Sequence, residues 1–246
     1  MSFHAPTDSI DPQSSDAGPP QGTGTNRTVY QTTEPATTPA AISNPTGPGC
    51  GAAQPDRGQP VNPRDDLALY LDTMWGRGEG YAHTAVGLKP HWGEGRYKHA
   101  RLQQSRHRWP RDRSTVIGNL LDAADHSDVY VCPYLLHGER REKGTAVIRL
   151  FVHADIDGDL EPAKVKQLQG FAVASGSPGH GHVYLALAEA VDLEDHQRLC
   201  KALGQHFGNA DAKISDNDLL RPPGTYSYKE AARGGDRTPV EWIVKP

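Results

Sequence analysis

Apolar residues recur every three to four positions in three stretches of the chain, a spacing that places them on one face of a helix. The predicted helices cover residues 65–75, 114–124 and 192–207. Ser114 and Asp192 open two of these stretches, and their side chains suit an N-terminal cap. Pro162 opens a shorter predicted helix that ends at residue 168, because proline fits the first helical turn.

Short runs rich in β-branched and aromatic residues predict strands, mostly in the second half. They cover residues 128–136, 146–154, 171–174, 182–187, 226–228 and 240–244. From the second run onward the order is strand, helix, strand, strand, helix, strand. This is the order of a split β-α-β unit like that of an RNA-recognition motif (RRM).

Residues 1–63 follow neither pattern. They hold 11 of the 20 prolines, with two basic and five acidic residues, and Gly, Ser, Thr and Gln fill most of the rest. Such a segment cannot bury enough apolar surface to offset chain entropy, so we expect a disordered tail before one folded domain at 64–246. The tail accounts for three of the four net negative charges, so the folded part is nearly neutral.

Composition excludes several classes of protein. No run of about 18 apolar residues is present, and the first residues lack the basic and apolar regions of a secretory signal. Cys50, Cys132 and Cys200 are scattered and form no C-x-x-C, which argues against a disulfide framework and against a cysteine zinc site. We therefore expect a cytoplasmic protein without a membrane partner.

A basic stretch follows the first predicted helix. Residues 77–113 hold nine basic and three acidic residues, interleaved with aromatic ones. Basic groups release counterions from phosphates, and aromatic rings stack on bases, so this stretch predicts DNA contact. The alternative is a solvated loop with its tryptophans turned into the core. The candidate DNA contacts are Arg96, Lys98, Arg101, Arg106, Arg108 and Trp109.

Two carboxylates end an apolar strand in the string Asp155-Ile156-Asp157-Gly158. Residues i and i+2 of a strand share one face, so Asp155 and Asp157 converge. Such a pair suits Mg²⁺ or Mn²⁺, and the alternative is two solvated carboxylates. The string fails as an EF-hand because Gly158 is the fourth residue rather than the sixth. It also resembles the nucleophile loop of haloacid-dehalogenase-type phosphatases, which lies near the start of that fold.

Two further segments carry candidate phosphate contacts. A small-residue turn with Ser175 and Ser177 leads into a strand on which His180 and His182 share a face. Metal binding by the two histidines, or a plain turn with surface histidines, are the alternatives. Residues 211–229 place an arginine before a Pro-Pro-Gly turn and a lysine after it. Arg221 and Lys229 suit a triphosphate, and Asp211 suits a third metal ligand.

The order of these three segments resembles the archaeo-eukaryotic primase (AEP) superfamily, and within it the primase-polymerases of plasmids, phages and actinobacteria. The resemblance covers roughly residues 75–244. It implies that an α/β unit at about 64–145 packs against an RRM-like unit at about 146–246 in an α+β catalytic core, with the site between them. It implies metal binding by Asp155, Asp157 and Asp211, catalysis by these three and His182, and nucleotide contacts by Ser175, Ser177, His180, His182, Arg221 and Lys229.

One position departs from the pattern, and one assignment has rivals. His180 stands where the S-x-H motif of the family has serine, so either Ser175 or Ser177 is the substitute or that contact is lost. Asp216 and Asp218 compete with Asp211, which we prefer because it follows a small apolar residue at the end of the helical segment.

The function implied by the resemblance is DNA primase or polymerase activity in the replication of a plasmid, phage or bacterial element. Mg²⁺ or Mn²⁺ would be the cofactor, a (d)NTP the substrate and single-stranded DNA the template. A replicative helicase, fused downstream or acting in trans, is the implied partner.

Two other readings of the same residues remain. One is a metal-dependent phosphatase with Asp155 as nucleophile. The other is a rolling-circle-initiator-like DNA-binding or nicking module that uses the two histidines with Tyr226 or Tyr228. Gly181 argues against nicking, because such nickases normally carry a bulky apolar residue between the histidines.

Overall fold

The computed structural model describes residues 62–246 except 77, 209 and 211–213. The predicted tail therefore lies almost entirely outside the described residues, as does Asp211. The helices are α1 (Pro63–Trp75), α2 (Arg113–Ala124), α3 (Pro162–Gln167), α4 (Leu193–Phe207) and the short 3₁₀ helix η1 (Ala231–Arg233). The strands are β1 (Gly80–Gly93), β2 (Arg96–Trp109), β3 (Asp128–Val131), β4 (Phe151–Ile156), β5 (Phe171–Ala174), β6 (Gly181–Ala186), β7 (Thr225–Ser227), β8 (Thr238–Val240) and β9 (Trp242–Val244).

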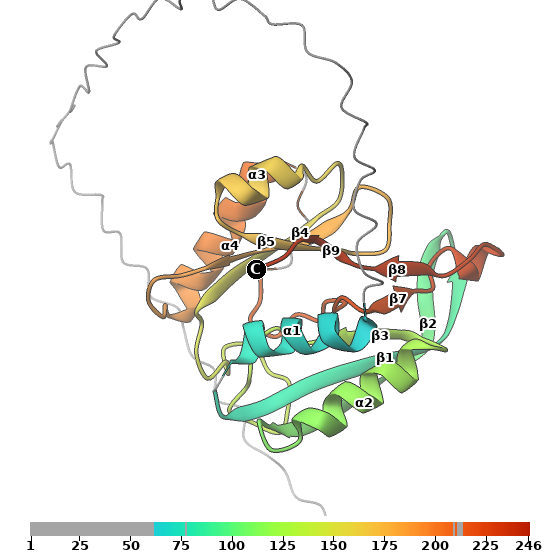
Figure 1. The fold of residues 1–246 in the computed structure, drawn as a ribbon, viewed down its shortest axis with the longest axis horizontal. Helices are drawn as coiled ribbons and strands as arrows, with labels where there is room; N and C mark the ends of the chain where they lie inside the picture. Colours follow the sequence, from blue (N-terminus) through green and yellow to red (C-terminus); the bar gives the residue numbers. More distant parts are fainter. Residues whose placement is uncertain (1–61, 77, 209, 211–213) are drawn as a thin grey trace, which may run out of the picture. The chain divides into compact units, whose positions relative to one another are not determined.

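Two antiparallel sheets form the framework, so the fold is mixed α and β (Figure 1). The first sheet has the order β2-β1-β3 and the second has the order β4-β6-β5-β9, while β7 and β8 form a small separate pair. Helix α1 lies between the two larger sheets, and α3 and α4 cover the outer face of the second. No helix among the described residues is long and apolar enough to cross a membrane.

One apolar cluster joins the two sheets through α1. Leu67 and Leu71 of α1 are fully buried in the same cluster as Val131 of the first sheet and Val173 of the second. Tyr70, also on α1, reaches the second sheet, where its hydroxyl lies 2.9 Å from that of Tyr184. Burial of such side chains contributes about 1.5–3 kcal/mol each, so α1 holds the sheets in a fixed relation.

The helices lie where the hydrophobic spacing predicts them, with one difference in capping. The side chain of Asp192 accepts a hydrogen bond from the backbone N–H of Asp195, as expected of a cap for α4. Helix α2 instead begins at Arg113, so Asp112 rather than Ser114 occupies its N-cap position, and Asp112 makes no side-chain cap bond there. The predicted strand run 128–136 is shortened to β3, and the run 146–154 is shifted toward the C-terminus, since β4 begins at Phe151 and ends at Ile156.

A long hairpin, β1–β2, occupies most of the basic stretch, so the stretch is not a loop, although Trp109 is turned into the core as the alternative expected. Most side chains of β2 are exposed, and the strand forms because it pairs with β1 along its length. Glu94 and Gly95 both have positive φ, 53° and 74°, which matches the twist of a two-residue hairpin turn.

The second sheet contains the expected element order from β4 through α3, β5, β6 and α4 to β9. The first three strands lie in the order of a split β-α-β unit. The closing strand β9 pairs with β5, at the opposite edge of the sheet from β4. In an RRM the closing strand lies beside the first strand, so the position of β9 differs from that pattern.

The glycine of the Pro-Pro-Gly turn gives a test of this packing. Gly224 has a φ of +78°, and a Cβ placed there would lie 2.2 Å from the carbonyl oxygen of Pro63 at the start of α1. We expect Gly224→Ala to lower the free energy of unfolding by about 2 kcal/mol or more, measured by urea denaturation. The control is Gly118→Ala in α2, where the added methyl meets open space and should stabilise by about 0.5–1 kcal/mol. Equal effects of the two substitutions would contradict this packing.

Candidate active site

A cavity of about 220 Å³ lies where the ends of β4 and β6 meet the turn after β5 and the loop before β7. It gathers all the described residues that the sequence predicted for the metal and nucleotide sites. Its lining residues are Tyr97, Tyr130, Asp155, Asp157, Ser175, Ser177, His180, His182, Leu219, Arg221 and Lys229. Residues more than 70 positions apart in the sequence thus share one cavity wall.

Two aspartate–histidine pairs form one side of the cavity. Asp155 and His182 are register partners on β4 and β6, and His182 Nε2 lies 3.4 Å from Asp155 Oδ1. Both side chains are buried. One step further out, His180 Nδ1 lies 3.1 Å from Asp157 Oδ1, and the Asp157 side chain is 60% exposed. The site therefore has one buried and one solvent-facing carboxylate, each beside an imidazole.

His180 replaces the serine of the S-x-H pattern, and the structure gives it a partner of its own. Its ring contacts Asp157, while Ser177 accepts a hydrogen bond from Lys229 Nζ at 3.1 Å. Gly176, between the two serines of the turn, has a φ of +87°, and a Cβ there would lie 2.2 Å from the Cβ of Ser227 on β7. The turn therefore packs closely against β7, the strand that precedes Lys229.

Arg221 enters the cavity from the loop before β7 and is held by three contacts. Its Nε donates to Asp128 Oδ1 at 2.9 Å, one Nη donates to the Tyr130 hydroxyl at 2.9 Å, and the other donates to the Ser175 carbonyl at 3.2 Å. The guanidinium also lies over the Tyr130 ring, 4.9 Å from its centroid. These contacts fix both the position and the orientation of the guanidinium plane.

Asp128 is a fully buried carboxylate that the sequence did not identify. Besides Arg221 it accepts hydrogen bonds from Tyr97 of β2, from His99 of β2 at 2.9 Å, and from the backbone N–H of Tyr228 at 3.2 Å. Burial raises the pKa of this carboxyl, but the hydrogen bond with His99 and the charge of Arg221 outweigh burial and lower the pKa to about 2. The carboxyl therefore stays ionised at neutral pH.

Tyr97 and Tyr130 are further cavity residues that the motifs did not indicate. Burial raises the pKa of both phenols, so both remain neutral. In the sequence, Asp128 and Tyr130 are two positions apart at the start of a predicted strand. Arg221, which contacts both side chains, is about 90 residues away, so no local motif identifies these three residues as a group.

The two rivals of Asp211 do not line the cavity. Asp216 is fully buried and accepts hydrogen bonds from Arg149 at 2.6 Å and from the backbone N–H of Gly144 at 2.8 Å, so it holds the loop before β4. Asp218 lies 3.3 Å from His153 Nε2. Asp211 itself is outside the described residues.

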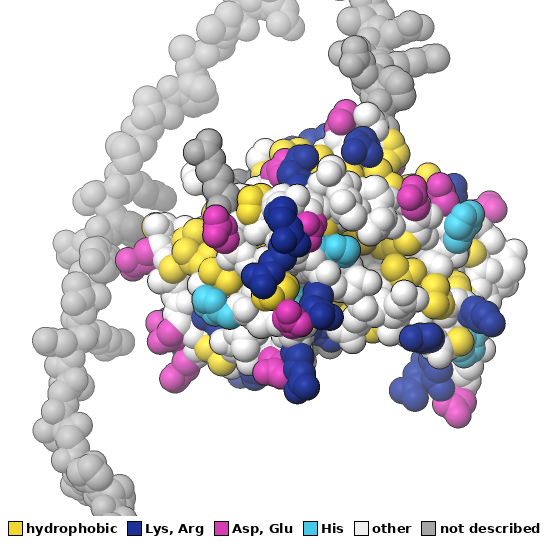
Figure 2. Space-filling view, turned by 90° about the horizontal axis from the view of Figure 1, so that it is seen from below, with side chains coloured by type: hydrophobic (Ala, Val, Ile, Leu, Met, Phe, Trp, Pro, Cys, Tyr) yellow, Lys and Arg dark blue, Asp and Glu magenta, His cyan; other side chains and the backbone are white. Residues whose placement is uncertain are grey.

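The basic residues predicted to bind DNA lie on β2, the edge strand of the first sheet. Arg96, Arg101, Arg106 and Arg108 are exposed there, and Lys98 is partly buried. Acidic side chains accompany some of them, since Arg96 and Lys98 pair with Glu94, and Arg106 pairs with Glu139 at 2.9 Å. Figure 2 shows Lys and Arg side chains spread over the visible face with acidic groups between them.

The prediction for Trp109 is corrected by its position. Its side chain is only 3% exposed, its ring packs edge-on to Trp75 with centroids 4.8 Å apart, and its Nε1 donates to the Gly76 carbonyl at 3.1 Å. A ring that fills the core beside α1 cannot also stack on a base. Its role in this structure is therefore packing.

The nicking alternative also needs a tyrosine beside the histidine pair. Neither Tyr226 nor Tyr228 is among the residues that line the cavity. The Tyr228 hydroxyl donates to the Ala124 carbonyl at the end of α2 at 3.0 Å, and the Tyr226 ring lies under Arg237. The geometry therefore does not favour this alternative.

Solved structures with a similar fold exist, although no family model and no curated protein matches the chain. The AEP domain of the cyanophage S-2L primase-polymerase matches 74% of this chain and 90% of its own length, with a TM-score of 0.52 and 13% sequence identity. The chain has the fold of an AEP primase-polymerase domain. The AEP-like, mixed α and β fold that the three motifs predicted is thus confirmed, whereas the RRM-like arrangement of its second unit is not.

Two other structures were found with lower scores. The primase RepB' matches 73% of this chain with 18% identity and a TM-score of 0.49, and this chain spans 55% of its length. The polymerase domain of Mycobacterium tuberculosis Ligase D in complex with DNA matches 67% of this chain and 75% of its own length, with 15% identity and a TM-score of 0.40. At these scores neither adds to the argument.

The buried carboxylate predicts a specific response to acid. Because the folded-state pKa of Asp128 lies near 2, below the ordinary 3.8, its contribution is fully present above about pH 4 and is lost as pH falls toward 2. We expect Asp128→Asn, which leaves Arg221 buried without its counter-charge, to lower the free energy of unfolding by about 3–5 kcal/mol at pH 7. The loss should shrink between about pH 4 and pH 2, as measured by urea denaturation across this range.

The matched control is Asp72→Asn, since Asp72 pairs with Arg113 through two hydrogen bonds at the surface. That pair is half exposed, so its removal should lower stability by less than about 1 kcal/mol. Equal losses in the two variants would contradict a central role for Asp128.

Proposed function

We propose that this domain is a template-directed DNA primase-polymerase, which transfers nucleotidyl groups from (d)NTPs to a 3′-hydroxyl. The single observation that carries the proposal is the cavity, which brings Asp155 and Asp157 together with Arg221 and Lys229. Enzymes catalyse phosphoryl transfer mainly by stabilising charge and by positioning the reactants. A cavity with carboxylates at one wall and cations at another suits that need.

The carboxylates fit a divalent cation by the chemistry of their donor atoms. Asp155 and Asp157 supply carboxylate oxygens, the ligands that Mg²⁺ and Mn²⁺ prefer, at the end of one strand. When bound, the cation would lower the pKa of the attacking hydroxyl and stabilise the charge of the departing pyrophosphate. Asp211 remains a predicted third carboxylate.

The basic residues would bind the triphosphate of the incoming nucleotide. Lys229 is held beside Ser177, and Arg221 is held beside Ser175, so both cations flank the small-residue turn. The turn has Gly176 and Gly179 with positive φ, which lets it pack closely against Ser227 and Asp159. His182, held by Asp155, would donate to a phosphate oxygen from the floor of the cavity.

The hairpin β1–β2 offers a path for the template. Tyr97 of β2 lines the cavity, and Arg101, four positions further along this edge strand, is exposed and shares its face. Arg96 and Lys98 alternate with Tyr97 and lie on the opposite face of β2. A single strand that follows the face of Tyr97 would therefore meet Arg101 outside the cavity and an aromatic ring that lines it. The sites predicted for template and nucleotide thus adjoin.

The remaining features of the proposal rest on the family pattern. The cavity would lie between catalytic subunits at about 64–145 and 146–246. The setting would be replication initiation of a plasmid, phage or bacterial element in the cytoplasm. A replicative helicase, fused downstream or acting in trans, would supply the single-stranded template.

The test is primer synthesis on circular single-stranded DNA with labelled nucleotides and Mg²⁺ or Mn²⁺, followed by sizing of products. Asp155→Asn and Asp157→Asn should each lower the rate by about 10²–10³-fold, because each removes a charge that the transition state needs. The matched control is Asp159→Asn, an exposed carboxylate in the same loop that does not line the cavity, and it should retain the activity.

Three results would contradict the proposal. Undiminished synthesis by Asp155→Asn and by Asp157→Asn would contradict the assignment of these two residues as metal ligands. Hydrolysis of small phosphate esters without DNA synthesis would favour the phosphatase. Nicking of supercoiled DNA that depends on Tyr226 or Tyr228 would favour the initiator-like module.

A further inference from the structure

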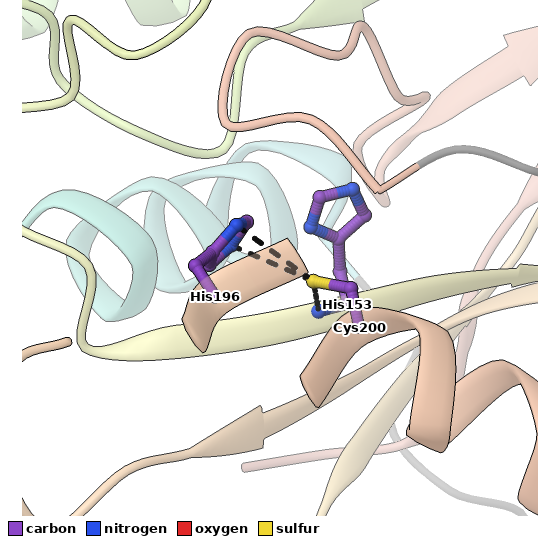
Figure 3. Close-up of side chains that lie close together, drawn as sticks. All are labelled: His153, His196 and Cys200. Atoms are coloured by element: carbon purple, nitrogen blue, oxygen red, sulfur yellow. Dashed lines mark hydrogen bonds between the residues drawn. The ribbon is translucent and has the colours of Figure 1, made fainter. Parts of the chain in front are cut away.

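A second group of potential metal ligands lies behind the cavity, on the inner part of β4. His153, His196 and Cys200 are all buried, and one ligand atom from each lies within 4.8 Å of the others. Figure 3 shows the three side chains converging, with the Cys200 sulfur directed at the His196 ring. None of the three lines the candidate active site.

Two elements supply these side chains in a pattern that suits metal binding. His196 and Cys200 are four residues apart on α4, so they project from one face of the helix. His153 lies on β4, two residues before Asp155, and its backbone N–H donates to Cys200 Sγ at 3.5 Å. A bound ion would therefore tie α4 to the strand that carries the candidate catalytic carboxylate.

The spacing of Cys200 and His196 matches a tetrahedral ion of the zinc class. Bonds of about 2.0–2.1 Å to nitrogen and about 2.3 Å to sulfur place neighbouring ligand atoms about 3.3–3.6 Å apart. Cys200 Sγ lies 3.5 Å from His196 Nε2. A thiolate with two imidazoles is a donor set for Zn²⁺, whereas Mg²⁺ prefers oxygen, so this group differs in chemistry from the aspartate pair.

Tyr134 supplies a fourth donor atom. Its hydroxyl oxygen lies 3.0 Å from His153 Nδ1 and 2.8 Å from His196 Nε2, and its proton is directed to the Phe151 carbonyl at 3.0 Å. This oxygen therefore lies beside one nitrogen of each imidazole. With it, the group offers four potential donor atoms, which is the coordination number of structural zinc sites.

Asp218 contacts one of the potential ligands, His153, from outside the group. Its Oδ2 lies 3.3 Å from His153 Nε2, the ring nitrogen that faces away from Tyr134. A carboxylate on the far nitrogen of a ligating histidine fixes the tautomer and the ring orientation. The charges also balance, because Zn²⁺ together with one thiolate and one carboxylate gives a net charge of zero in a buried place.

The two described cysteines differ in their surroundings. Cys200 Sγ lies 3.5 Å from His196 Nε2 and accepts a hydrogen bond from the backbone N–H of His153. Cys132 Sγ instead lies 3.5 Å from the carbonyl oxygen of Asp216. Only Cys200 therefore has an imidazole beside its sulfur, and thiolate and imidazole are ligands that zinc accepts together.

We propose that His153, His196, Cys200 and Tyr134 bind one structural Zn²⁺ ion, with Asp218 supporting His153. The sequence argued against a zinc site because it lacks C-x-x-C. The ligands instead come from a strand, a helix and a loop that meet only in the fold. This zinc site is separate from the cavity proposed for nucleotidyl transfer. An experiment can therefore disprove either proposal without disproving the other.

The first test measures metal in the full chain purified without chelator and dialysed against Mg²⁺. We expect about one equivalent of zinc by elemental analysis. After zinc removal and titration with Co²⁺, we expect thiolate-to-cobalt charge-transfer absorption and the visible bands of a tetrahedral site. A zinc-free protein whose titration with Co²⁺ gives neither absorption would overturn the proposal, and this measurement needs no variant.

Variants then identify the ligands. Cys200→Ser should abolish the charge-transfer absorption, and Asp218→Asn should weaken zinc binding by about 10–100-fold. Cys132→Ser and the double variant Asp155→Asn with Asp157→Asn are the controls, and each should keep the zinc and the cobalt spectrum. Loss of zinc in either control, or an unchanged cobalt spectrum in Cys200→Ser, would overturn the assignment.

Discussion

The buried carboxylate of Asp128 is the constraint on which the arrangement of the site depends. It lies at the start of β3 and accepts hydrogen bonds from two residues of β2, from Arg221 and from the backbone next to Lys229. A buried charge of this kind is stable only while its partners remain in place. Asp128 therefore fixes strand β2, strand β3 and the loop before β7 relative to one another.

The position of Arg221 in the cavity follows from this constraint. The guanidinium shares its contacts between Asp128, Tyr130 and the turn at Ser175, so it spans from the first sheet to the second. Helix α1 provides the matching apolar link, through residues such as Tyr70 and its partner Tyr184. One polar and one apolar connection thus set the width of the cavity.

The sequence predicts the parts of the site that are local in the chain. The spacing of Asp155 and Asp157 on a strand, the serine-rich turn and the Pro-Pro-Gly segment each carry their own signal, and the described residues from these segments meet in one cavity. Helix positions follow from apolar periodicity in the same way. What these signals share is that the residues that produce each one lie within a few positions of one another.

The parts that the sequence does not predict depend on long-range pairing. The hairpin β1–β2 has few buried side chains on β2, so no alternating pattern marks it. Trp109 looks like a base-stacking residue until the fold places it against Trp75. Asp128 and the cluster at His153 involve partners from three or more segments. Burial and pairing decide these positions, and neither can be read from spacing along the chain.

Crystallography with bound nucleotide tests the central claim most directly. Crystals grown with Mn²⁺ and a non-hydrolysable deoxynucleoside triphosphate would be measured by anomalous diffraction at the manganese edge. The account predicts a manganese peak beside Asp155 and Asp157, with the triphosphate between Lys229 and Arg221. A triphosphate bound outside this cavity, or manganese with no contact to either aspartate, would contradict it.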